Sequence, residues 1–165
     1  MTPTLITAPT AQPVSLAALK EQCRVDPSNT ADDATITALG AAAVAHLDGW
    51  TGVLGRCIMP QTWRVTATAG DVVLPMPDIV TASAGYEAGA ADLAITLSAL
   101  GPVVTITEAC DITFDCAMPV SLLPVAQMAI RLMVQRDYDM VSGPDRDAFD
   151  RSIDALVSAC RWRRV

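Results

Sequence analysis

The sequence predicts an α+β protein, mostly a helical bundle with two N-terminal and two C-terminal helices and a small antiparallel β insert. Two observations predict this class. Apolar residues recur at spacings of three and four before residue 52 and again after residue 121, as they do along one face of an α-helix. Between these regions, from residue 62 to 115, apolar and polar residues alternate, which is typical of strands with one buried face.

The length and composition predict a single domain. The chain has 165 residues, of which 52% are hydrophobic and 18% charged, so it is long enough to bury a core and too apolar to be disordered. The domain is expected to comprise an extended N-terminal arm (1–14), a helical segment (15–52), the β insert (62–115), a second helical segment (121–160) and a C-terminal tail (161–165).

The N-terminal arm contains Pro3, Pro9 and Pro13 among threonines and alanines, so it is expected to be extended. Ser15 is a candidate N-cap. A short helix is expected to follow it, from about Leu16 to Cys23, and to end before the next proline.

A long helix and a glycine stop form the centre of the predicted fold. Asp32 and Asp33 suit the positive end of its dipole, and Gly52 can adopt the left-handed conformation that ends a helix. The apolar stripe of this helix consists of Ile36, Leu39, Ala43, Leu47 and Trp50. Trp50 and Trp63 are expected to pin the helix end to the following sheet. The predicted structural core here is Leu47, Trp50, Gly52 and Trp63.

The β insert is expected to contain about four to six short strands separated by Gly, Pro and Asp turns. The strand candidates are residues 62–68, 72–74, 79–86, 93–97, 103–107 and 112–114. Residues 84–99 are rich in alanine, so their pairing cannot be assigned from the sequence.

The two C-terminal helices differ in their polarity. Residues 125–134 are apolar on most sides, so the first helix is expected to be buried on several sides. Pro144 suits the first turn of the last helix. Aspartates crowd the first half of that helix and Arg161 follows its end, an order that matches the helix dipole.

Catalytic chemistry has little support. His46 is the only histidine and lies in the long helix, where a structural role is the better explanation. Asp147, Asp150 and Asp154 are close enough in sequence to share a cation or a proton, but a solvated helix face accounts for them better. The glycines of residues 49–55 follow a helix and lack the Gly-Lys-Ser/Thr of a phosphate loop. We therefore predict no enzyme, no cofactor and no metal site.

Charge and cysteine usage restrict the partners and the compartment. The formal charge of −7 disfavours non-specific binding to nucleic acid. No stretch is apolar for long enough to span a membrane, and the first residues do not have the pattern of a signal peptide. Five reduced and mostly buried thiols are expected, in a reducing cytoplasm, at Cys23, Cys57, Cys110, Cys116 and Cys160.

The C-terminal pentapeptide stands out in an acidic protein. It consists of Arg161, Trp162, Arg163, Arg164 and Val165. In one interpretation the tryptophan folds back onto the helices while the arginines cap the last helix. In the other the pentapeptide is a docking tail, because Trp and Arg are enriched at interface hot spots.

Two tryptophan-containing words give a resemblance to a known family. The segment from His46 to Gly52 (HLDGWTG), followed after a loop by Pro60 to Trp63 (PQTW), resembles the head–tail connector, or adaptor, proteins of tailed phages and of phage-like gene-transfer-agent particles. The order of helices, β insert and a Trp/Arg-containing end is also similar along essentially the whole chain. The small β insert is the part that departs most from this family.

The resemblance implies a structural role. Adaptors of this family form a ring, usually a dodecamer, between the portal and the stopper or tail-completion protein, and double-stranded DNA passes through the ring without specific binding. Their C-terminal segment inserts into the portal, which here implies portal contacts at Arg161, Trp162, Arg163, Arg164 and Val165. The implied location is the bacterial cytoplasm during assembly and then the neck of the particle, with no membrane contact. The alternative is a small cytoplasmic regulatory or nucleic-acid-binding module whose arginine-rich end grips phosphate.

Overall fold

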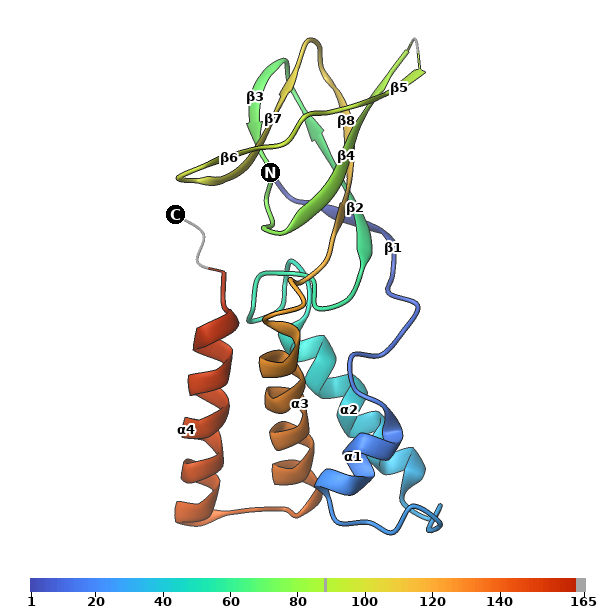
Figure 1. The fold of residues 1–165 in the computed structure, drawn as a ribbon, viewed down its shortest axis with the longest axis vertical. Coiled ribbons are helices and arrows are strands. Elements are labelled where there is room, and N and C mark those ends of the chain that lie inside the picture. The colour runs from blue at the N-terminus through green and yellow to red at the C-terminus, as the bar shows by residue number, and fades with distance from the viewer. Residues whose placement is uncertain (88, 163–165) are drawn as a thin grey trace.

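The computed structural model describes residues 1–87 and 89–162 as two halves stacked along the long axis of the molecule (Figure 1). The helices of the helical half are α1 (Leu16–Gln22), α2 (Asp33–Leu47), α3 (Leu123–Tyr138) and α4 (Gly143–Cys160). The strands of the β half are β1 (Thr4–Thr7), β2 (Gln61–Ala67), β3 (Gly70–Val73), β4 (Ile79–Tyr86), β5 (Gly89–Asp92), β6 (Thr96–Ser98), β7 (Gly101–Ile106) and β8 (Cys110–Cys116).

The strands form two antiparallel sheets. The larger has the order β1-β2-β8-β4-β5 and the smaller the order β3-β7-β6. The inner faces of the two sheets pack on each other. Val65, Ile112 and Phe114 come from the larger sheet, and Val104 and Ile106 from the smaller. The alternation of buried and exposed residues along β2 and β8 is the period of two seen in the sequence.

The prediction of a mostly helical bundle was wrong. The protein is 35% helical and 27% strand, with sheets of five and three strands, so the β half is a full layer of the fold and not a small insert. The short strands β5 and β6 lie in the alanine-rich region, where local propensity is weak and pairing with β4 and β7 decides the conformation. The N-terminal arm also contributes a strand, β1, which pairs with β2.

The helical half is ordered around α3, which lies between α4 and the pair α1–α2 (Figure 1). Its core contains Ile36 and Leu47 of α2, Ile130 and Val134 of α3, and Ile153 of α4 among other residues. Three interactions of one lysine connect the first two helices of this half. The buried Lys20 donates to the Pro27 and Asn29 carbonyls at 3.0 and 2.6 Å and pairs with Asp33 at 2.8 Å, which holds the loop between α1 and α2.

Candidate docking site at the junction of the two halves

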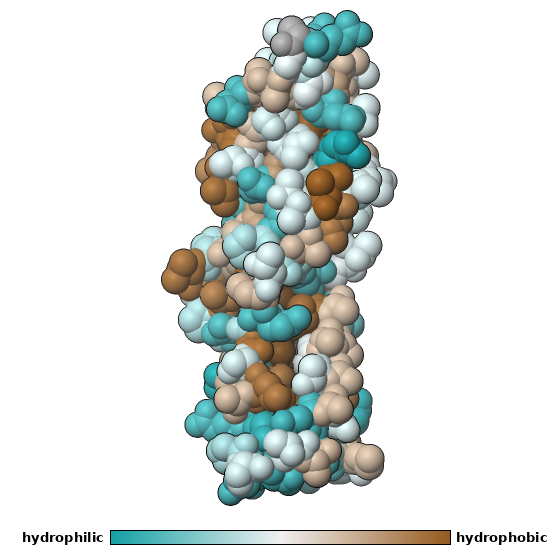
Figure 2. All heavy atoms as spheres, turned by 90° about the vertical axis from the view of Figure 1, so that its right-hand side faces the viewer, coloured by the Kyte–Doolittle hydropathy of each residue, from teal (hydrophilic) through white to brown (hydrophobic). Residues whose placement is uncertain are grey.

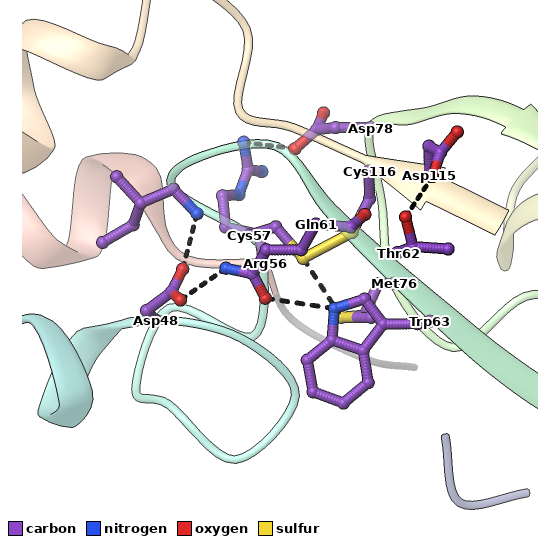
Figure 3. Close-up of a disulfide and its surroundings, with 11 residues drawn as sticks. Asp48, Arg56, Cys57, Gln61, Thr62, Trp63, Met76, Asp78, Asp115 and Cys116 are labelled. Carbon is purple, nitrogen blue, oxygen red and sulfur yellow. Dashed lines mark hydrogen bonds and ion pairs between the residues drawn. A yellow bond between two sulfur atoms is a disulfide. The ribbon is translucent and has the colours of Figure 1, made fainter. Parts of the chain in front are cut away.

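The junction is built from the two tryptophan-containing words of the sequence. The Asp48 carboxylate, at the end of α2, accepts the Ile58 N–H at 2.7 Å and the side-chain amide of Gln61 at 2.5 Å. The carbonyl oxygen of the same Gln61 side chain accepts the indole N–H of Trp63 at 3.1 Å (Figure 3). One hydrogen-bonded chain therefore links the end of the long helix to the first strand of the β half.

Two glycines allow this close approach. Gly49 has φ +77°, and a Cβ on it would lie 3.3 Å from the Trp63 ring. A Cβ on Gly52 would lie 2.2 Å from the Asp48 carbonyl oxygen, a separation that non-bonded atoms cannot adopt. The glycines of the HLDGWTG word are thus required by the turn that carries the chain from α2 toward the β half.

Charged groups are buried at the same junction. The side chains of Arg56 and Asp78 form an ion pair at 3.0 Å with little exposed surface. Burial raises the pKa of the Asp78 carboxyl, and the Arg56 guanidinium opposes that rise. Burial also raises the pKa of the Asp48 carboxyl, against the hydrogen bonds from Ile58, Gln61 and Gly49 that lower it. Burying these charged side chains without partners would lower the stability of the fold. The Arg56–Asp78 ion pair and the hydrogen bonds to Asp48 therefore fix the geometry of the loop that carries them.

The prediction of five reduced thiols was wrong for one pair. Cys57, in the loop before β2, is joined by a disulfide to Cys116 at the end of β8, with 6.1 Å between their Cα atoms (Figure 3). Their separation of 59 residues gives no sign of pairing in the sequence. They meet because Gln61 and Cys116 are register partners in the sheet. Cys23, Cys110 and Cys160 are free and buried.

The C-terminal tail leaves α4 at this junction. Arg161 is exposed, whereas Trp162 is half-buried and donates its backbone N–H to the Leu54 carbonyl at 2.8 Å. Its ring lies against β7, where a Cβ on Gly101 would be 3.4 Å from the indole. The remaining predicted portal-binding residues, Arg163, Arg164 and Val165, lie outside the described residues.

A hollow of about 190 Å³ lies beside the tail. It is lined by residues with largely apolar side chains, namely Met1, Trp50, Val73, Leu74, Pro75, Leu100 and Trp162. Both the first residue of the chain and the last described one therefore border the same hollow. Of the four residues predicted as structural core, Leu47 and Trp63 are buried, while Trp50 and Gly52 are half-buried.

Of the residues considered for catalysis, His46, Asp150 and Asp154 border one hollow of about 460 Å³, together with Arg136, whereas Asp147 is not part of its lining. His46 is exposed near the end of α2, and Asp147 and Asp154 are exposed on α4. Asp150 is engaged by Arg136 of α3 at 2.6 Å. No group of three or more His, Cys, Asp or Glu side chains in residues 1–87 and 89–162 is placed to hold a metal ion. None of the helices in this described part is long and apolar enough to cross a bilayer.

Sequence reasoning missed the polar residues that organise the junction. The sequence-based predictions gave no structural role to Asp48, Arg56 or Asp78. One signal was available, because Arg56 stands alone within the uncharged run from Thr51 to Thr62. A single charge in such a run indicates a buried partner. The partner itself, Asp78, follows a strand-ending Pro and could not be chosen among the other aspartates.

Comparison with known proteins identifies the fold. No protein-family model and no curated protein matches this sequence. A chain from a structure described as "Neck of empty GTA particle computed with C6 symmetry" is 17% identical, with a TM-score of 0.69. A chain from "Virion of native gene transfer agent (GTA) particle" is 18% identical, with a TM-score of 0.63. Each comparison covers 100% of this chain and 97% of the other. The chain thus has the fold of gene-transfer-agent particle chains, which supports the resemblance to head–tail connectors.

Proposed function

We propose that this protein is a structural head–tail connector, or adaptor, in the neck of a phage-like particle of the gene-transfer-agent kind. It forms a ring between the portal and the stopper, lets double-stranded DNA pass, and has no catalytic role. The observation that carries the proposal is the end-to-end fold match with a chain of a particle neck, over 100% of this chain and 97% of the other. The match includes both the helical half and the β half.

Ring formation requires two different surfaces on opposite flanks of one copy, since contacts around a ring are head-to-tail. The helical half offers such flanks, because α3 separates α4 from α1 and α2 (Figure 1). The neck structure with the same fold was computed with C6 symmetry, with which a dodecameric ring is compatible. These two observations support a ring of copies standing side by side.

The exposed face of α2 is suited to be one of the two surfaces that contact a neighbouring copy in the ring. Residues 34–45 contain no charged side chain, although α2 lies at the surface. Its exposed residues are small, namely Ala34, Thr35, Thr37, Ala38, Ala41, Ala42 and Ala45. A groove of about 320 Å³ runs beside this face, lined by α1, α2 and the N-terminal arm. Figure 2, which faces this flank, shows weakly hydrophobic residues in a column over the helical half. A surface helix without charges is typical of one that is covered in an assembly.

The opposite flank presents a second row of small side chains. On α4, Ala148, Ser152, Ala155 and Ala159 are all exposed and recur at spacings of four, three and four. Such a row lets another helix approach closely. We assign the contact between neighbouring copies in the ring to α2 of one copy and α4 of the next.

The charge distribution supports a channel that does not retain DNA. Between Arg56 and Met118 the sequence has two basic and seven acidic residues. On the exposed face of the larger sheet, Asp115 accepts hydrogen bonds from Thr62 and Thr81 at 2.6 and 2.7 Å, and Asp111 accepts one from Thr66. Arg64 lies 3.8 Å from Asp111 on the same face, so its charge offsets one of these aspartates. The acidic excess of the whole β half still disfavours phosphate, which argues against the nucleic-acid-binding alternative.

We propose that the portal contact lies in the C-terminal tail, Arg161 to Val165, because this segment begins at the junction with Arg161 and carries three arginines. The test is co-sedimentation of the full-length protein with rings of the portal protein encoded beside it, with a DNA-binding assay in parallel. Portal binding together with no salt-sensitive DNA binding supports the adaptor. DNA binding without portal binding would contradict it and favour the alternative.

A further inference from the structure

Three segments meet at Trp162. Its backbone N–H is bonded to Leu54, a buried residue of the loop between α2 and β2. Its ring packs over Gly101 at the start of β7. Its own position is the second residue after α4 ends. Trp162 therefore follows a helix, binds a junction loop through its backbone N–H and packs on the smaller sheet through its ring.

The surroundings of the indole are those of a packing site. Trp162 borders the 190 Å³ hollow together with the apolar side chains of Trp50, Val73 and Leu100. Within the helical half, α4 packs along α3, and Trp162 extends that packing across the junction to the β half. A hot-spot side chain gains its binding energy by losing water at the interface. An indole that is already half-buried within its own chain has less such energy left for a partner.

We propose that Trp162 is an intramolecular clamp that fastens the end of α4 to the β half, and that the portal contact belongs to the arginines that follow it. The clamp holds the end of α4 and the two residues that follow it against the smaller sheet. This inference rests on the proposed function for its second part only, because the clamp itself is a property of the isolated chain.

The test uses full-length variants and two separate measurements. Trp162→Ala removes the clamp, Trp162→Phe keeps an aromatic ring in the hollow, and Arg163→Ala/Arg164→Ala removes the following charges. Ser158→Ala, at an exposed position of α4, is the stability control. Thermal unfolding measures the clamp, and co-sedimentation with portal rings measures docking.

The clamp predicts that Trp162→Ala lowers the Tm by about 4–8 °C, as expected for truncating a half-buried aromatic side chain in a chain of this size. Trp162→Phe is expected to restore most of the Tm and of the portal binding. The double arginine variant is expected to keep the wild-type Tm and lose portal binding. An unchanged Tm in Trp162→Ala together with lost portal binding, not rescued by Phe, would overturn the proposal and make the indole a portal contact.

Amide hydrogen exchange at Trp162 provides a second readout. The bond to the Leu54 carbonyl predicts a protected Trp162 N–H in the free protein. The clamp predicts that this protection persists when portal rings are added, whereas loss of protection on binding would mean that the tryptophan is released to the portal. If wild-type protein does not bind portal rings, the proposed function fails, and the Tm series still decides whether the clamp exists.

Discussion

The carboxylate of Asp48 and the side-chain amide of Gln61 are hydrogen-bonded at 2.5 Å, and this contact joins the helical half to the β half. Gln61 is buried and uses both ends of its amide, since it also accepts the Trp63 indole N–H. The two sequence words that resemble adaptor proteins are therefore the two sides of one structural joint. Their resemblance reflects how the fold is held together, not a chemical activity.

Gln61→Ala is expected to destabilise the protein by about 1–3 kcal/mol, because it leaves a buried indole N–H and the Asp48 carboxylate without their partner. Urea unfolding followed by circular dichroism measures the change. Thr66→Ala is the control: it also removes a cross-strand hydrogen bond, but on an exposed face, and should cost less than about 0.5 kcal/mol. An equal loss of unfolding free energy in the two variants would show that the hydrogen bonds of Gln61 contribute no more to stability than an exposed cross-strand hydrogen bond.

The pH dependence of stability should reveal Asp48. Because burial raises its pKa above the ordinary value of 3.8, the folded state binds the proton more tightly than the unfolded state. The wild type should thus gain stability relative to Asp48→Asn as the pH falls through the raised pKa toward 3.8, and lose it as the pH rises. The measurement is the difference in unfolding free energy between the two proteins across that window. A difference that is constant with pH, or that changes in the opposite direction, contradicts this assignment.

Gly52→Ala should be severely destabilising, by about 3 kcal/mol or more, since the added methyl group meets two backbone carbonyls of the α2 end. Gly85→Ala is the matched control in β4, where a Cβ would have its nearest contact at an ordinary 3.6 Å from the Asp111 carbonyl oxygen. That variant should change stability by less than about 1 kcal/mol. Thermal unfolding of both proteins compares them directly, and similar Tm values would be inconsistent with the turn geometry.

The disulfide should contribute to stability through the long loop that it closes. With a sequence separation of 59 between Cys57 and Cys116, removing the disulfide as Cys57→Ser/Cys116→Ser is expected to cost about 2–4 kcal/mol. Denaturant unfolding with and without dithiothreitol supplies the control, because reductant should lower the stability of the wild type and leave the double variant unchanged. A wild-type protein that is insensitive to reductant would contradict the contribution of this bond.

Ala38→Glu is expected to prevent ring assembly without unfolding the chain, since it places a charge in the middle of the exposed, uncharged face of α2. Negative-stain microscopy of the protein bound to portal rings measures assembly, and circular dichroism checks the fold. Ala90→Glu, at an exposed position of β5, should assemble normally. Normal rings from Ala38→Glu would exclude this face from the interface between copies.

The helices could be predicted from the sequence because their periodicity is strong. The stripe from Ile36 to Trp50 identified α2, although the helix ends at Leu47 and Trp50 lies in the turn that follows. The apolar run of residues 125–134 identified α3. The sheets were underestimated for a physical reason. Strands such as β1 (TLIT) and β5 (GAAD) have little buried surface of their own, so only pairing with β2 and β4 defines them. Long-range pairing of this kind leaves no local pattern.

The candidate site was predictable only in its position along the chain. The tail could be singled out in the sequence because it combines Trp and Arg in an acidic protein. The packing of Trp162 against Gly101 could not, because it depends on how the β6–β7 turn meets the end of α4. The Arg56–Asp78 ion pair and the Cys57–Cys116 disulfide likewise join residues that are distant in sequence. Each is a consequence of the sheet register, which the sequence does not encode locally.

The central claim is that this chain is a ring component of a particle neck, and cryo-electron microscopy of particles produced by the encoding genome tests it most directly. We predict density for this fold as one ring between portal and stopper, with the end of α4 directed to the portal and α2 of each copy against α4 of the next. Particles whose neck is complete without this chain, or that carry it elsewhere, would contradict the claim.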